Sequence, residues 1–195
     1  LRMYDPVSGA ISINGTDIRN IRISALRKLI SYVPQDVFLF SDTVKNNIRF
    51  GSGNASDEAV MTAARQAAVD GEISRFAEGY DTMIGERGVN LSGGQKQRLS
   101  IARALCKACD LLLFDNCLSA VDAKTEKQIL SGLNEVMKDK TAIIITHRIF
   151  SLFEFDKIIV LEDGTITEQG RHGELMALNG YYSELYHKQQ DIEGN

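Results

Sequence analysis

The sequence feature that most constrains the fold is a pair of short apolar runs separated by a helical pattern. The runs are residues 111–114, which end at the carboxylate of Asp115, and residues 142–145. Between them, residues 123–137 place apolar side chains at helical spacing. Strands that alternate with helices predict a largely parallel sheet with helices on both faces. We therefore expect an α/β fold with about four parallel strands.

Length and charge narrow the class of protein. A chain of 195 residues with 44% hydrophobic and 25% charged residues is typical of one globular domain. Its net charge of −4 argues against a nucleic-acid partner held by phosphate electrostatics. The apolar runs are too short to cross a bilayer, so any membrane attachment would need other segments.

The three cysteines, Cys106, Cys109 and Cys117, do not form a disulfide framework, and a reducing compartment fits this usage. Cys106 and Cys109 have C-x-x-C spacing. A metal site would need a second pair of ligands, and none is evident, so we interpret them as small apolar residues at the end of a helix.

The rest of the chain divides into a core and an inserted helical segment. Capping residues and periodicity predict helices at 23–29, 43–48, 56–69, 72–77, 94–107, 173–178 and 181–188, and strands at 9–15 and 30–33. A hairpin is expected around Asp163-Gly164, and residues 1–6 are typical of the tail of a helix that ends at Pro6. We expect residues 1–35 and 109–195 to form the core and residues 36–108 an inserted helical subdomain.

The segment Leu91-Ser92-Gly93-Gly94-Gln95 is the main candidate for a binding site. A serine and two glycines that open a helix offer backbone N–H groups and a positive helix end to a phosphate. An isolated glycine pair would be an ordinary turn, but here the pattern continues through Arg98 and Arg103. With Asp115, the segment resembles the signature motif and the magnesium-binding strand of the nucleotide-binding domain of ABC transporters.

This resemblance implies a P-loop NTPase (RecA-like) fold and the ligands ATP and Mg²⁺. In the family, the signature residues Leu91 to Gln95 contact the γ-phosphate of ATP bound to the opposite subunit of a head-to-tail pair. Residues 88–94 only half-match a phosphate-binding loop, because Gly94 stands where a lysine is required. We therefore expect the P-loop to lie upstream of Leu1, in a domain truncated at its N-terminus.

The resemblance also assigns roles around Asp115, which would hold Mg²⁺ through water. Asp122 would lie in a loop that communicates with the opposite site. Asn116 stands where the family normally carries a glutamate base. An amide orients water but accepts no proton near neutral pH, so catalysis at this chain's own site is expected to be impaired. A heterodimer with a competent partner explains this pattern, and a deliberate inactivating substitution is the alternative.

Two more residues follow predicted strands. Gln35 resembles the glutamine that contacts Mg²⁺ and the attacking water, in a loop that packs on the membrane domain. His147 resembles the histidine that contacts the γ-phosphate, although a lone histidine after a strand is most often structural. Phe38, close to Gln35, would face the membrane domain or lie in the core. Residues 82–88 resemble a loop typical of exporters, in which Glu86 contacts the membrane domain; otherwise they form a charged surface turn.

The leading interpretation is therefore the ATPase domain of an ABC exporter at the cytoplasmic face of a membrane. Its partners would be a second ABC ATPase domain and a transmembrane domain, with no nucleic acid. One alternative is a soluble ABC ATPase that acts on nucleic acid or ribosomes; another is a catalytically silent regulatory half that binds ATP.

Overall fold

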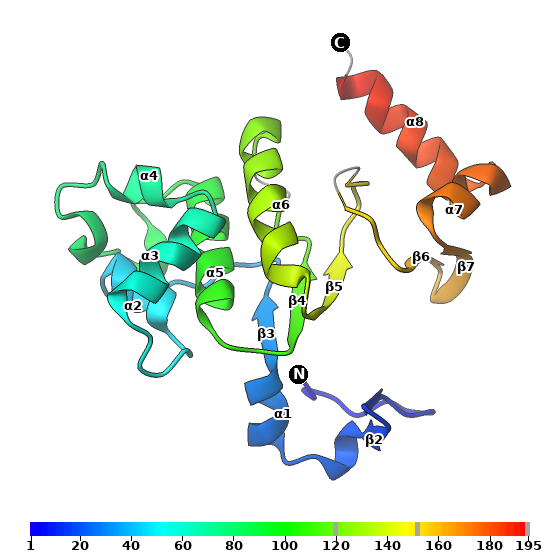
Figure 1. The fold of residues 1–195 in the computed structure, drawn as a ribbon, viewed down its shortest axis with the longest axis horizontal. Coiled ribbons are helices and arrows are strands. Elements are labelled where there is room, and N and C mark those ends of the chain that lie inside the picture. Colours follow the sequence, from blue (N-terminus) through cyan, green and yellow to red (C-terminus); the bar gives the residue numbers. More distant parts are fainter. Residues whose placement is uncertain (119–120, 151–152, 194–195) are drawn as a thin grey trace. The chain divides into compact units, whose positions relative to one another are not determined.

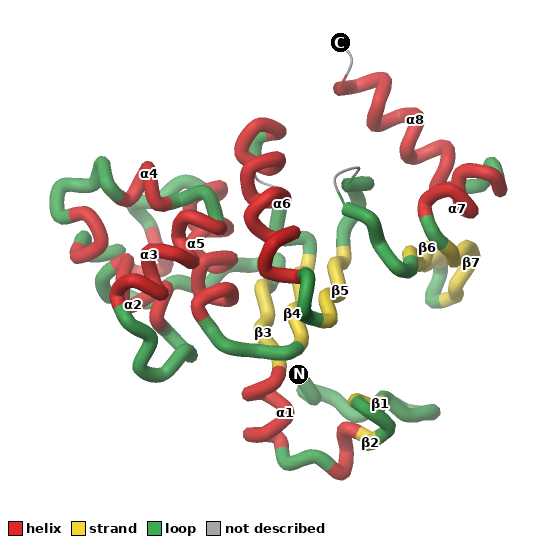
Figure 2. Tube along the Cα trace, viewed as in Figure 1, coloured by secondary structure: helices red, strands yellow, loops and turns green. Residues whose placement is uncertain are grey.

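A computed structural model describes residues 1–118, 121–150 and 153–193. The chain forms two units, Leu1–Ile145 and Thr146–Asn195, which are described separately below. Figure 1 labels their helices and strands where there is room, and Figure 2 colours the same trace by secondary structure. Within the described ranges, no helix is long and apolar enough to cross a membrane.

The centre of the first unit is a parallel sheet in the order β3-β4-β5. Its strands are β3 (Ile30–Val33), β4 (Leu111–Asp115) and β5 (Thr141–Ile145), and Val33 pairs with Phe114, which pairs with Ile144. The α/β prediction is confirmed, but this sheet has three strands rather than about four. Because all three run in one direction, the segments that follow them begin at the same edge.

The two faces of this sheet differ. Leu112 and Phe114 point to a face that is buried, and helix α6 (Ala123–Met137) buries Ile129, Leu130 and Leu133 along one stripe. The opposite face leaves Tyr32, Ile143 and Ile145 between 37% and 56% exposed. The expected helical cover on both faces is therefore absent at these three described residues.

The segment between β3 and β4 is largely helical. It contains α2 (Val44–Arg49), α3 (Asp57–Gln66), α4 (Asp70–Ile73) and α5 (Gly93–Cys106), with short 3₁₀ turns η2 (Gly79–Asp81) and η3 (Glu86–Gly88). The side chains of Thr43, Ser56 and Ser92 each cap a helix by accepting a backbone N–H. Helices α2 and α3 pack against α5, which places α5 at the centre of this segment.

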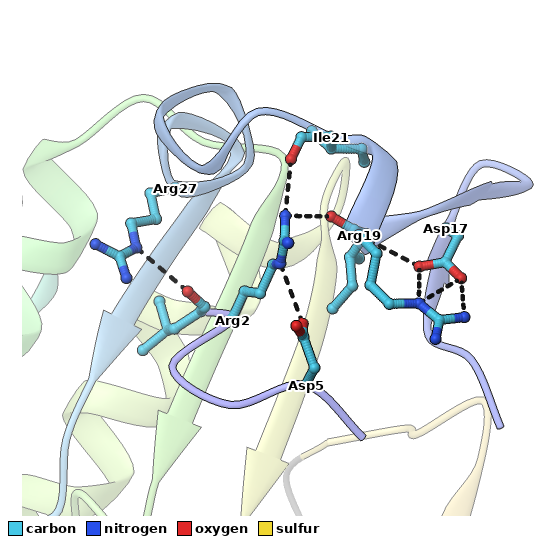
Figure 3. A network of polar contacts seen from close by, with 8 residues as sticks. Arg2, Asp5, Asp17, Arg19, Ile21 and Arg27 are labelled. Carbon is cyan, nitrogen blue, oxygen red and sulfur yellow. Dashed lines mark hydrogen bonds and ion pairs between the residues drawn. The ribbon is translucent and has the colours of Figure 1, made fainter. Parts of the chain in front are cut away.

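The N-terminal segment differs from its prediction. Residues 1–6 form no helix, and Arg2 adopts a positive φ of 50°. Arg2 instead donates to Asp5 and to the carbonyl oxygen of Ile21, as Figure 3 shows. It also donates to the carbonyl oxygen of Ile18. These contacts hold Arg2 in a non-helical conformation. The following elements are β1 (Ser12–Ile13), β2 (Thr16–Asp17), η1 (Ile18–Asn20) and α1 (Ile23–Leu29).

The second unit contains the predicted hairpin. Strands β6 (Ile158–Glu162) and β7 (Thr165–Gly170) pair antiparallel around Asp163 and Gly164, which both have positive φ. Helices α7 (His172–Leu178) and α8 (Tyr181–Glu193) follow. Glu168 accepts the backbone N–H groups of Tyr181 and Tyr182, which ties the start of α8 to β7.

Candidate functional site

The signature turn is held by a reciprocal cap at the start of α5. Ser92 Oγ accepts the backbone N–H of Gln95 at 3.2 Å, and Gln95 Oε1 accepts the backbone N–H of Ser92 at 2.9 Å. This capping box forms because a serine stands three residues before a glutamine. Since Ser92 Oγ is the acceptor in this cap, its own proton remains available to a ligand.

The turn is suited to an anion. Gly93 and Gly94 are the first residues of α5, so their N–H groups have no carbonyl partner within the helix. Ser92 and Gly93 are exposed, and the first turn of α5 contains no acidic residue. Helix α5 has 14 residues, and the positive end of its dipole adds to the field at the turn. Leu91 is half-buried and donates its N–H to the carbonyl of Gly88.

A second group of polar side chains follows the parallel strands. Asp115 ends β4, is half-buried, and accepts a 3.0 Å hydrogen bond on Oδ2 from the phenol of Tyr32 in β3. Burial, and secondly this contact, raise the pKa of Tyr32, which therefore stays a donor at neutral pH. Gln35 is exposed and follows β3, so it starts from the same sheet edge as Asp115.

The donor chemistry of this edge fits Mg²⁺. Asp115 supplies a carboxylate and Gln35 an amide oxygen, and Mg²⁺ prefers such hard oxygen ligands while keeping several waters. Among the described residues, no cluster of three or more His, Cys, Asp or Glu side chains forms a full protein cage for a metal. A shared site, in which phosphate and water supply the remaining ligands, matches this donor set.

Asn116 adopts a left-handed conformation, with φ of 45°, directly after β4. Its backbone N–H donates to the carbonyl of Ile145 at 2.8 Å. Asparagine tolerates this conformation better than most residues, because its short polar side chain can bond locally. Asn116 is therefore suited to its backbone position while it brings an amide, rather than a carboxylate, next to Asp115.

Asp122 caps helix α6. Its side chain is exposed and accepts the backbone N–H of Thr125 at 3.0 Å, and this hydrogen bond lowers the pKa of its carboxyl. Leu118 and Val121 of the same loop are buried. Ser119 and Ala120 lie outside the described residues. The loop thus has a well-anchored end at Asp122, and its role stays a prediction.

His147 belongs to the second unit, where it is exposed and follows β5 by two residues. His147 and Asp115 thus belong to different units. The contact of His147 with a phosphate stays a prediction.

The segment around Phe38 combines both of the alternatives considered for it. Phe38 is 52% exposed, whereas Leu39 is buried at 1%. Glu86 is exposed in η3, and at Gly88 of the same turn an added Cβ would lie 3.0 Å from Leu39 Cδ1. The turn that carries Glu86 therefore packs closely on the residue next to Phe38.

The sequence places Arg103 in the signature pattern but does not predict its contacts near Phe38. Arg103 donates to the carbonyl oxygens of Phe38 and Asn47, both at 2.8 Å, and its guanidinium lies over the rings of Phe40 and Phe50. Burial lowers its pKa to about 10, so it stays charged at neutral pH. Arg103 lies within helix α5, and its partners are more than 50 residues away in the chain. The sequence around Arg103 therefore does not predict these contacts.

The fold and the signature turn define an ABC-type ATP-binding domain, and comparison with known proteins agrees. The family described as ABC transporter matches residues 1–119. The chain belongs to this family, and within it to the nucleotide-binding domains of exporters, with a P-loop NTPase fold. ATP hydrolysis coupled to transport is the general activity of the family.

Several relatives align along nearly the whole chain. The mitochondrial iron-sulfur clusters transporter atm1 of Aspergillus fumigatus is 44% identical over 98% of the chain and 27% of its own length. The probable multidrug resistance ABC transporter ATP-binding/permease protein YheI of Bacillus subtilis is 47% identical over 97% of the chain and 32% of its own length. The ATP-dependent lipid A-core flippase of Legionella pneumophila is 46% identical, with the same coverage.

A solved structure is also similar. It is described as a bacterial Atm1-family ABC exporter with ATP bound, and it matches with a TM-score of 0.92 and 44% identity over 97% of the chain and 33% of its own length. The chain thus spans about a fifth to a third of the length of the proteins that it matches.

Proposed function

We propose that this chain is the ATPase domain of an exporter, at the cytoplasmic face of a membrane, and that its signature turn acts on ATP held by a second ABC ATPase domain. The capping box carries the proposal. In this box Ser92 Oγ accepts a hydrogen bond and keeps its own proton for a ligand. The N–H groups of Gly93 and Gly94, at the start of α5, have no carbonyl partner within the helix and would bind a γ-phosphate in a head-to-tail pair.

At its own site, Asp115 and Gln35 would hold Mg²⁺, which would supply positive charge beside the phosphates. Asn116 would orient water without taking its proton, and His147 would contact the γ-phosphate. Loss of a positioned base lowers rates by about 10²–10⁴-fold. This chain would therefore hydrolyse ATP slowly at its own site, while its signature turn serves a competent partner in a heterodimer.

The exposed side chains of Phe38 and Glu86 would contact the transmembrane domain. They belong to two turns that pack together at Gly88 and Leu39. A displacement of one turn would therefore displace the other. Nucleotide state would then be transmitted to the substrate pathway through this pair of turns.

Two substitutions in the complete transporter test the proposal. Gly93→Asp puts a negative charge where the partner's γ-phosphate would bind, so turnover should fall sharply. Asn116→Glu adds a base, so turnover should rise or stay unchanged. Normal turnover of Gly93→Asp would show that the signature turn serves no site in trans. A homodimer of the unmodified protein that hydrolyses ATP at a normal exporter rate would refute the impaired site.

Asn116 also favours a second candidate, a regulatory half whose bound ATP only holds the dimer together. In that case the Gly93→Asp protein would lose ATP-dependent dimerisation, and Asn116→Glu would create hydrolysis in a complex that otherwise has none. Turnover of the unmodified complex separates the two functions.

A further inference from the structure

Glu72, in the short helix α4, contacts two residues of α5 at once. Its Oε2 accepts a hydrogen bond from Gln95 Nε2 at 3.0 Å, and its Oε1 lies 2.8 Å from Arg98 Nη2. Glu72 and Gln95 are 23 residues apart in the chain. One carboxylate therefore connects a separate helix to the turn that carries the signature residues.

The second partner, Arg98, is almost fully buried, with a side chain that is 9% exposed. Besides Glu72, its guanidinium donates to the carbonyl oxygens of Gly94 at 3.2 Å and Ala68 at 3.0 Å. A buried guanidinium that loses its carboxylate is left with an unpaired charge, which is strongly unfavourable. Glu72 therefore balances the charge of a residue that itself contacts Gly94.

The Gln95 amide is used at both ends. Its Oε1 accepts the backbone N–H of Ser92, and its Nε2 donates to Glu72. The orientation of this amide thus determines whether the capping box can close, and Glu72 determines the orientation. Through Gln95 and Arg98, Glu72 acts on Ser92 and Gly94, the two sides of the turn.

We propose that Glu72 is the positioning residue of the signature turn: it holds the Ser92, Gly93 and Gly94 groups in the geometry that a γ-phosphate requires. Glu72 contacts no phosphate itself and acts through Gln95 and Arg98. The inference rests on the proposed function for its effect on hydrolysis, but its effect on the turn is measurable without nucleotide.

The first test uses hydrogen–deuterium exchange on the complete transporter without nucleotide. Glu72→Ala should speed the exchange of amides in residues 95–98 by about tenfold, because it removes a charge-assisted contact to the first turns of α5. Glu72→Gln should have a smaller effect, because its amide oxygen still accepts from Gln95 but cannot neutralise Arg98. Glu58→Gln, an exposed position in α3, is the matched control and should leave exchange unchanged.

The second test uses the complete transporter with both ATPase domains. Displacing catalytic groups slightly costs up to about 100-fold in rate. Glu72→Ala should therefore lower kcat by roughly 10- to 100-fold while nucleotide affinity at this chain's own site stays unchanged. A purely structural defect would instead reduce the folded fraction without separating kcat from affinity. Should Glu72→Ala not fold, Glu72→Gln decides, with Glu58→Gln beside it.

The outcomes separate this inference from the proposed function. Exchange and kcat like those of the unmodified protein in both Glu72 variants would overturn the positioning role. If Glu72→Ala loosens the turn while Gly93→Asp leaves turnover intact, the role of the turn in trans is wrong and the positioning role stands. Loss of turnover in Gly93→Asp, with no change in either Glu72 variant, gives the reverse conclusion.

Discussion

At the scale of single residues, the backbone of Asn116 limits what can replace it. Its φ of 45° costs most side chains about 1 kcal/mol or more, but asparagine and glycine less. We expect Asn116→Ala to lower the free energy of unfolding by about 1 kcal/mol and Asn116→Gly to change it little. Urea unfolding of the two variants measures this; equal stabilities would contradict the left-handed conformation. A glutamate base introduced here would carry the same strain.

The environment of Cys117 leads to a second prediction at this scale. Burial raises the pKa of its thiol to about 12, so almost none is thiolate at pH 8. Maleimide labelling of the native chain at pH 8 should therefore leave Cys117 unmodified, and labelling in denaturant should reach it. Peptide mapping by mass spectrometry gives the answer. Rapid native labelling of Cys117 would show that the segment after β4 opens readily.

At the scale of elements, the Ser92 cap has structural and functional roles that can be separated. Ser92→Ala and Ser56→Ala remove equivalent caps from α5 and α3, so each should cost about 1 kcal/mol in the free energy of unfolding. Only Ser92→Ala should also reduce turnover of the complete transporter, since Ser56 lies in another helix. Thermal unfolding and ATPase assays compare the pair. An equal loss of turnover in both variants would indicate a stability effect alone.

The elements also show what sequence could predict. Helix α6 and strand β3 match their predicted bounds. In each, the apolar spacing and the flanking residues, such as Pro34 after β3, indicate the same element with the same ends. Residues 1–6 were predicted wrongly, since Arg2 finds carbonyl partners that are distant in sequence. The signature turn was predicted from its residues, whereas the contacts of Glu72 and Arg103 were not, because tertiary packing alone brings their partners together.

At the scale of the whole molecule, the 195-residue chain contains no lysine-bearing phosphate loop. We therefore expect this chain alone to bind ATP weakly, because its own site has few remaining groups that would contact the phosphates of ATP. Titration with a fluorescent nucleotide in the presence of Mg²⁺ measures the affinity. A dissociation constant in the low micromolar range would mean that residues 1–195 hold most of the phosphate contacts themselves.

The uncovered face of the parallel sheet has a practical consequence for handling the chain. The exposed apolar side chains are Tyr32 in β3 and Ile143 and Ile145 in β5, and β5 stands last in the order of its sheet. Exposed apolar surface at an edge strand promotes aggregation. Light scattering of the isolated chain should rise with concentration, and Ile145→Lys should suppress the rise. The sheet that carries Asp115 is thus also the surface through which purified molecules are expected to aggregate.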